Sequence, residues 1–167
     1  MMGIAAGHAG RRSAARLAVV QALYRIEVSR PAVETVIAEI ADGRQGVRIG
    51  EDEYVEVDHA LLAEVVRGAM ARRAEIDLLI AETLDKQRRL ERLEAVLRAL
   101  LRAGTYELLA RHDVPARVVI NEYVDIAHAY FGGREPDFAN GVLDRLGRRL
   151  RPDEMGRQPD DRPRAAG

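Results

Sequence analysis

The amino-acid sequence predicts an all-α protein, a helical bundle of about seven helices. Three observations support this class. Alanine, leucine, arginine and glutamate are abundant, and all four are good helix formers. Aromatic residues make up only 4% of the 167 residues and tryptophan is absent, which disfavours β-sandwiches and barrels. Apolar residues recur at helical spacing over most of the chain, and no segment shows the clear alternation of a strand.

Two helices are predicted before a long irregular segment. Apolar residues repeat at helical spacing over about residues 12–28, which predicts the first helix. A second helix follows over about residues 31–41, because Pro31 suits the first turn of a helix. Residues 42–57 contain three glycines and an acidic stretch, and we expect a surface loop there.

The middle of the chain predicts three more helices. Asp58 is expected to cap a helix that extends to about residue 70, and a shorter one follows over about 76–84. Residues 90–111 are predicted to form the longest and most apolar helix, with apolar side chains on nearly all sides, so it should lie at the centre. Gly104 inside it costs about 1 kcal/mol relative to alanine, which indicates a close helix crossing.

The last two helices are predicted over residues 115–131 and 135–150. Gly132 and Gly133 separate them, and each begins with a proline in or next to its first turn. From Arg151 onward no apolar period remains, so residues 152–167 are expected to form a disordered tail. The first ten residues are expected to form a flexible arm, which leaves one helical domain over residues 11–151.

The composition argues against several kinds of chemistry. The chain has no cysteine, which excludes disulfides and thiolate sites and fits a reducing cytoplasm. No apolar run approaches the roughly 20 residues that span a bilayer, and no glycine-rich phosphate loop is present. Glu122, Asp125 and His128 lie on nearby turns of one predicted helix, but a solvated polar face is a commoner reason for such a pattern than a metal site. We therefore expect a protein that is not an enzyme and binds no cofactor or metal.

The strongest local charge lies at the start of the first helix. The whole chain has 26 basic and 27 acidic residues, so it has no general attraction for nucleic acid. Residues 1–30 differ, because they contain five arginines and one glutamate. Arg12 and Arg16 are four positions apart and are expected to share one helix face, with Arg11 beside them. Positive charges at the N-terminus of a helix repel one another and are disfavoured by the helix macrodipole. A bound phosphate would relieve this repulsion, so the arrangement favours a phosphate-binding role.

Four segments resemble known motifs, in the order in which one family has them. They are residues 12–24 with Val-Val-Gln-Ala-Leu-Tyr, residues 96–108, residues 113–122 with Asp-Val-Pro and Ile-Asn-Glu, and residues 138–144 with Phe-Ala-Asn-Gly-Val-Leu-Asp. Over about residues 11–152 the chain resembles the NusB family of bacterial antitermination factors. Because four motifs match with the right spacing, the resemblance is highly specific.

The resemblance implies both an architecture and a function. It implies two packed helical subdomains, about 11–87 and 88–151. It implies binding of boxA-type single-stranded RNA from ribosomal RNA operons, together with NusE, a small-subunit ribosomal protein. The resulting complex acts with RNA polymerase in the cytoplasm, away from any membrane, and suppresses premature termination. Relatives of this kind can also form homodimers.

The resemblance also implies a set of RNA-binding residues: Arg11, Arg12, Arg16, Gln21, Tyr24 and Phe138. Gln21 can offer an amide to a base edge, and the rings of Tyr24 and Phe138 can stack on bases. For both aromatic residues, packing in the core is an equally good interpretation. The motif is thinner than in some relatives, because Ser13 and Ala14 stand where those carry arginine, and Asp137 stands where a relative has lysine.

Four other matching residues are expected to be structural. Asn121 and Glu122 are expected to tie helices together. Asn140 is expected to form a hydrogen bond to the backbone, and Gly141 to lie at a close helix contact.

Two other functions stay open. One alternative is the similar helical domain of a ribosomal RNA cytosine methyltransferase, without its catalytic part. The other is a protein-interaction scaffold without affinity for RNA.

Overall fold

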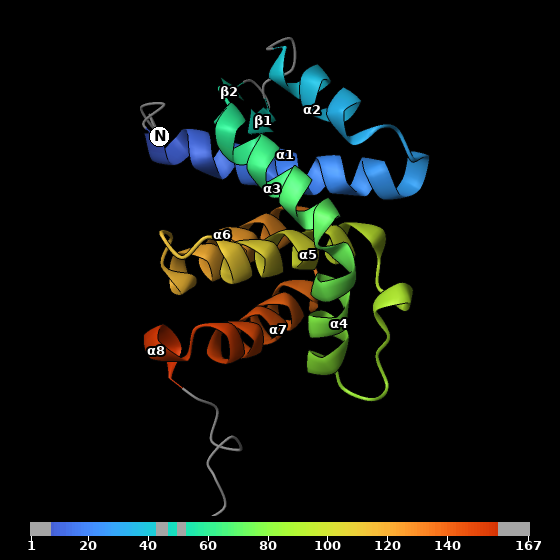
Figure 1. Ribbon diagram of the computed structural model, residues 1–167, viewed down its shortest axis with the longest axis vertical. Helices are drawn as coiled ribbons and strands as arrows, with labels where there is room; N and C mark the ends of the chain where they lie inside the picture. The colour runs from blue at the N-terminus through green and yellow to red at the C-terminus, as the bar shows by residue number, and fades with distance from the viewer. Residues whose placement is uncertain (1–7, 43–46, 50–52, 157–167) are drawn as a thin grey trace, which may run out of the picture.

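The computed structural model describes residues 8–42, 47–49 and 53–156. Within these residues the chain forms eight α-helices, one short 3-10 helix and one two-stranded sheet (Figure 1). The elements in order are α1 His8–Ser29, α2 Val33–Ala41, β1 Val47–Ile49, β2 Glu53–Val55, α3 His59–Ala71, α4 Arg73–Thr83, η1 Leu90–Arg92, α5 Ala95–Ala110, α6 Ala116–Tyr130, α7 Glu135–Leu150 and α8 Pro152–Met155. The helical-bundle class is confirmed.

The capping and breaking signals of the sequence act as expected at several helix ends. The Asp58 carboxylate accepts a hydrogen bond from the backbone N–H of Leu61 at 3.1 Å and caps α3. Pro115 is the residue before the first turn of α6, and that helix ends immediately before Phe131 and the two glycines. Helix α7 begins at Glu135, with a proline in its first turn.

The segment between α2 and α3 contains a hairpin, which the sequence did not predict. Strands β1 and β2 are antiparallel, with Val47 opposite Val55 and Ile49 opposite Glu53. Both strands contact α1 (Figure 1). The backbone N–H of Asp58 also donates to the carbonyl of Arg11 at 3.1 Å, which ties the end of this segment to α1. The expectation of a plain loop is wrong because strands this short take their stability from tertiary contacts rather than from their own pattern.

Helix α5 lies at the centre, as predicted, but it is shorter than predicted. It contacts α1, α3, α4, α6 and α7, and eleven of its residues are buried. It begins at Ala95 rather than near residue 90, and its 16 residues are fewer than the 22 of α1. Arg98 Nη1 donates to the carbonyls of Leu90 and Glu91 at 3.3 and 3.2 Å. These carbonyls would otherwise bond along a continuous helix, so Arg98 stabilises the break.

Glycines permit close approach where helices cross. A Cβ atom on Gly104 would lie 2.9 Å from Leu143 Cδ2 and 3.4 Å from the ring of Tyr123. This confirms the predicted close crossing, which involves α5, α6 and α7. The corresponding expectation for Gly141 is wrong, because the nearest atom to its Cβ position is Arg145 Nη2, at 3.9 Å.

The chain stays ordered past the predicted end of the domain. Arg151 is buried and donates to the backbone carbonyls of Leu108, Glu107 and Arg111 at 2.8, 2.8 and 2.6 Å, and also to that of Val114. Helix α8 follows directly. The expectation of a disordered tail is therefore wrong for residues 152–156, because one arginine satisfies several carbonyls near the end of α5. The expectation of a flexible arm is likewise wrong for residues 8–10, which belong to α1. Residues 1–7 and 157–167 lie outside the described part of the chain.

The predicted division near residue 88 stays a prediction. Helix α5 separates α1 on one side from α7 on the other (Figure 1). The buried apolar residues on both sides of it belong to one continuous cluster. None of the described helices combines the length and apolar character that crossing a membrane requires.

Candidate nucleic-acid interface

The predicted arginine face of α1 divides into exposed and buried residues. Arg11 is exposed and forms an ion pair with Glu56, Nη2 to Oε2 at 3.1 Å. Arg12 is exposed and has no ion pair within the described ranges. It lines a hollow of about 170 Å³ together with Asp58, Glu64 and Arg111. Because exposed ion pairs contribute little, Arg11 can exchange its partner for phosphate at small cost.

Arg16 lies inside the protein rather than on this surface. Only 2% of the residue is exposed, and its Nε and Nη2 each donate to the Glu107 carboxylate at 2.9 Å. The hydroxyl of Tyr123 donates to the same carboxylate. The expectation that Arg12 and Arg16 share an exposed face is therefore wrong. The two arginines do have helical spacing, but Arg16 binds the buried carboxylate of Glu107 on α5 and is therefore held away from the surface.

The environment fixes the charge state of this buried cluster. Burial by itself lowers the pKa of Arg16, but hydrogen bonding and charge attraction from Glu107 outweigh it and raise the pKa above its ordinary value. Burial raises the pKa of Tyr123 well above its ordinary value, and the charge of Glu107 adds to the effect. Arg16 is thus a cation and Tyr123 a neutral donor at physiological pH.

Gln21 and Tyr24 lie on the solvent side of α1. Gln21 is exposed, and Tyr24 is 39% exposed, so its ring is accessible rather than part of the core. The two are three positions apart and share one face. Arg12 and Gln21 are nine positions apart, and at about 100° per residue they lie on opposite sides of the helix. Arg12 therefore lies on a different side of α1 from Gln21 and Tyr24, whereas Arg11, ten positions from Gln21, lies about 80° from it.

Phe138 lies on a different part of the molecule. It is half-buried in the first turn of α7, and α5 lies between α7 and α1. The guanidinium carbon of Arg88 is 4.4 Å from the centre of the Phe138 ring. The structure thus brings Gln21 and Tyr24 together and places Phe138 apart from both.

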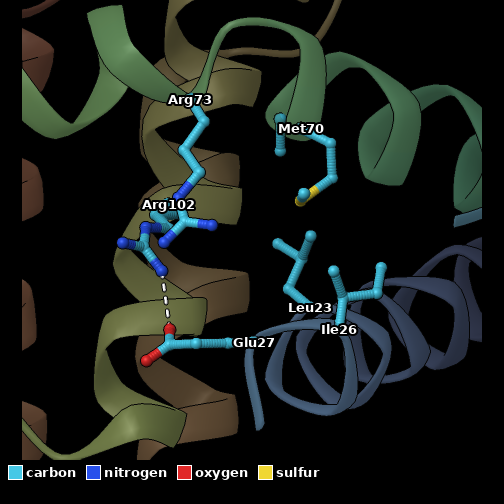
Figure 2. A pocket seen from close by; sticks show the side chains of 7 residues that line it. Leu23, Ile26, Glu27, Met70, Arg73 and Arg102 are labelled. Atoms are coloured by element: carbon cyan, nitrogen blue, oxygen red, sulfur yellow. Dashed lines mark hydrogen bonds and ion pairs between the residues drawn. The ribbon is translucent and has the colours of Figure 1, made fainter. Parts of the chain in front are cut away.

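A network of ion pairs sets the position of α1 relative to α4 and α5. Glu27 of α1 pairs with Arg98 and, at 2.7 Å, with Arg102 of α5. Arg102 Nε in turn pairs with Asp77 of α4 at 2.8 Å. Figure 2 shows Glu27 reaching Arg102 beside the apolar Leu23, Ile26 and Met70. The cavity there has a volume of about 10 Å³, which is no more than a water molecule needs, so the network is structural.

The remaining matched residues have mixed roles. Glu122 accepts a hydrogen bond from Ser13 Oγ at 3.0 Å and ties α6 to α1, as expected. Asn121 and Asn140 are exposed and line a polar hollow with Arg117, and the described residues show no side-chain hydrogen bond from either. Ala14 is fully buried, so an arginine would not fit there.

No group of three metal-ligating side chains occurs in the described part of the chain.

One basic segment was missed by the sequence reasoning. Residues Lys86, Arg88, Arg89 and Arg92 are all exposed between α4 and α5, and we call Lys86–Arg92 the basic linker. Its run of positive residues is visible in the sequence. Only Arg92 of these four falls within the helix predicted over residues 90–111, and the other three lie in the short gap between two predicted helices.

Comparison with known proteins gives a consistent result. The model of the NusB family matches residues 13–148. The transcription antitermination protein NusB of Bradyrhizobium diazoefficiens is 44% identical over 155 residues, which are 93% of this chain and 94% of that protein. A solved structure of T. maritima NusB has a TM-score of 0.70 and 34% identity, over 86% of this chain and 95% of that one.

A second solved structure is a complex. The crystal structure of the antitermination factors NusB and NusE with dsRNA contains a chain similar to this one, with a TM-score of 0.66 and 25% identity. The match covers 82% of this chain and 96% of that chain. The family model spans most of the sequence, and the fold agrees with the solved structures. The chain belongs to the NusB family.

Proposed function

We propose that this protein is an RNA-binding transcription antitermination factor. It binds boxA-type RNA of ribosomal RNA operons together with NusE and helps RNA polymerase resist premature termination. The observation that carries the proposal is the similarity, over 82% of the chain, to a protein solved with NusE and dsRNA. The match to 94% of a curated antitermination protein favours this function over that of a methyltransferase domain.

The proposed RNA-binding residues on α1 are Arg11, Arg12, Gln21 and Tyr24, with Phe138 on α7. Their exposure supports this role, because each has side-chain atoms that a nucleotide can reach. Arg16 acts through the fold instead, since its guanidinium is held by Glu107. The accessible basic surface of α1 is small, so we expect NusE to contribute to RNA affinity.

A salt series of binding measurements tests the function. The full-length protein is titrated with a fluorescently labelled boxA-type single-stranded RNA, with and without NusE. We expect binding that weakens steeply with salt and tightens when NusE is added. Arg12→Ala should weaken binding and lower the salt slope, because one phosphate contact is lost. Arg117→Ala is the matched control, since Arg117 is also exposed and has no ion pair among the residues described.

Three outcomes would contradict the proposal or its site assignment. Absence of RNA binding in both conditions excludes an RNA-binding role and leaves the scaffold interpretation. Equal affinity of the isolated protein and its NusE complex contradicts the dependence on the partner. Equal losses in Arg12→Ala and Arg117→Ala would show that Arg12 has no specific place in the interface.

A further inference from the structure

Arg88 covers one face of the Phe138 ring. The distance of 4.4 Å from its guanidinium carbon to the ring centre is that of a cation–π contact. The two residues come from separate elements, the segment after α4 and the first turn of α7. Guanidinium groups bind phosphate, and aromatic faces stack on bases. The pair therefore combines, in direct contact, the two groups that recognise a nucleotide.

The segment that carries Arg88 has a defined shape. The backbone N–H of Arg88 donates to the carbonyl of Asp85 at 3.0 Å, and that of Gln87 donates to the Asp85 carboxylate at 3.3 Å. Downstream, Leu90 is buried, and Arg98 binds its carbonyl. Arg98 is itself paired with Glu27 of α1. The turn and this anchor hold the segment at both ends and place Arg88 over the ring.

The basic linker supplies more unpaired charge than α1 does. None of its four basic residues forms an ion pair with any described residue. In α1, by contrast, Arg11 and Arg25 are paired with glutamates and Arg16 is buried. Two acidic residues, Glu135 and Asp137, share the first turn of α7 with Phe138 and repel phosphate. Arg88 places a positive charge directly beside the ring, which offsets them.

We propose that Arg88 is a further RNA-binding residue and that Arg88 and Phe138 together receive one unpaired nucleotide. The inference rests on the proposed function and deepens it. The base stacks on the ring face that Arg88 covers in the free protein, and the guanidinium turns to the adjacent phosphate. This exchange is favourable because an exposed cation–π contact is weaker than base–aromatic stacking.

The first test compares two arginines that differ only in location. Arg88→Met keeps the length and apolar stem of the side chain but removes its charge, and Arg117→Met is the matched control. Affinity for the labelled boxA-type RNA is measured over a salt series, with the full-length protein and NusE. We expect Arg88→Met to bind about tenfold more weakly at low salt, with a salt slope smaller by about 0.7, the value for one contact on a single strand. Arg117→Met should match the unsubstituted protein.

The second test reports on the ring itself. The chain has no tryptophan, so Phe138→Trp introduces a single tryptophan, whose emission can be excited apart from that of the five tyrosines. We expect RNA to quench its emission by stacking. In the free protein, adding Arg88→Ala should make the fluorophore more accessible to acrylamide, because its cover is removed. Unchanged emission on saturation with RNA would overturn the stacking assignment.

The outcomes separate this inference from the function on which it rests. If the unsubstituted protein binds no RNA with or without NusE, the proposed function fails. If it binds RNA and Arg88→Met binds with the same affinity and salt slope, only the assignment of Arg88 fails. Equal losses in Arg88→Met and Arg117→Met would likewise overturn it, since they would reflect net charge alone.

Discussion

Arg16 and Glu107 form a two-point ion pair in the buried contact between α1 and α5. Both N–O distances are 2.9 Å, and the two side chains are 3% and 0% exposed. The pair fixes the rotation and register of α1 against the central helix. It thereby decides that Gln21 and Tyr24 face the solvent. A residue that resembles an RNA contact in sequence is thus a positioning residue in the structure.

Arg16→Met should destabilise the protein without a selective effect on the RNA interface. The substitution leaves the Glu107 carboxylate buried without its cation, and the expected loss is about 3–5 kcal/mol of unfolding free energy. Urea denaturation measures it. The control Arg12→Met should stay within about 0.5 kcal/mol, because Arg12 is exposed.

A double variant checks the cause of this loss. Arg16→Met with Glu107→Gln removes both charges and keeps an acceptor for the Tyr123 hydroxyl. It should recover part of the lost stability, since no uncompensated buried charge remains. A stable Arg16→Met protein that no longer binds RNA would contradict the positioning role and restore Arg16 as a direct contact.

Two glycine substitutions should change stability in opposite directions. A Cβ on Gly68 of α3 would lie 2.1 Å from Cζ of the buried Tyr106, so Gly68→Ala should cost about 1–3 kcal/mol by overpacking. A Cβ on Gly141 of α7 meets only the end of Arg145, at 3.9 Å. Gly141→Ala should therefore stabilise the protein by about 0.5–1 kcal/mol through helix propensity. Thermal unfolding of both variants measures the contrast, and a stabilised Gly68→Ala would refute the tight contact with Tyr106.

Glu27 should contribute to the acid sensitivity of the fold. The hydrogen bond from Arg98 lowers the pKa of Glu27 below its ordinary value of 4.5, although partial burial opposes the shift. A lowered folded-state pKa gives stability that is present above about pH 4.5 and is lost as the pH falls through the folded-state value. Glu27→Gln should thus be less stable than the unsubstituted protein at pH 7, by about 1 kcal/mol.

The difference should shrink as the pH falls below 4.5, when Glu27 becomes protonated in the unsubstituted protein as well. Urea unfolding at pH 7, 4.5 and 3 follows it. The control Glu39→Gln removes an exposed carboxylate that pairs with Arg25, and it should change little at any pH. A gap between Glu27→Gln and the unsubstituted protein that stays constant with pH would contradict the assignment.

Arg151 should be as important to stability as a core residue. Arg151→Met leaves the carbonyls of Leu108, Glu107, Arg111 and Val114 without the donor that satisfies them. We expect a loss of about 3 kcal/mol or more in urea unfolding, because buried acceptors are left unpaired. Arg145→Met, an exposed substitution on α7, should be nearly neutral. Equal stability of the two variants would show that the chain past α7 does not support the fold.

Local signals predicted most of the helices but not their interruptions. The cap at Asp58, the break at Pro115 and the close crossing at Gly104 each act through neighbours in sequence or through the absence of a side chain. The hairpin after α2 and the helix start at Ala95 depend on contacts with distant segments. Periodicity within a window contains no information about such contacts.

The sequence by itself determined the helical class, the central place of α5, the NusB family and the surface character of Arg12 and Gln21. Each depends on residue type, on helical spacing or on motifs in a fixed order. The tertiary structure alone decided that Arg16 is buried, that Arg151 belongs to the core, and that Arg88 lies over Phe138. An arginine has the same charge and helical position whether it faces water or a carboxylate. Only the packing of distant helices determines which of the two it meets.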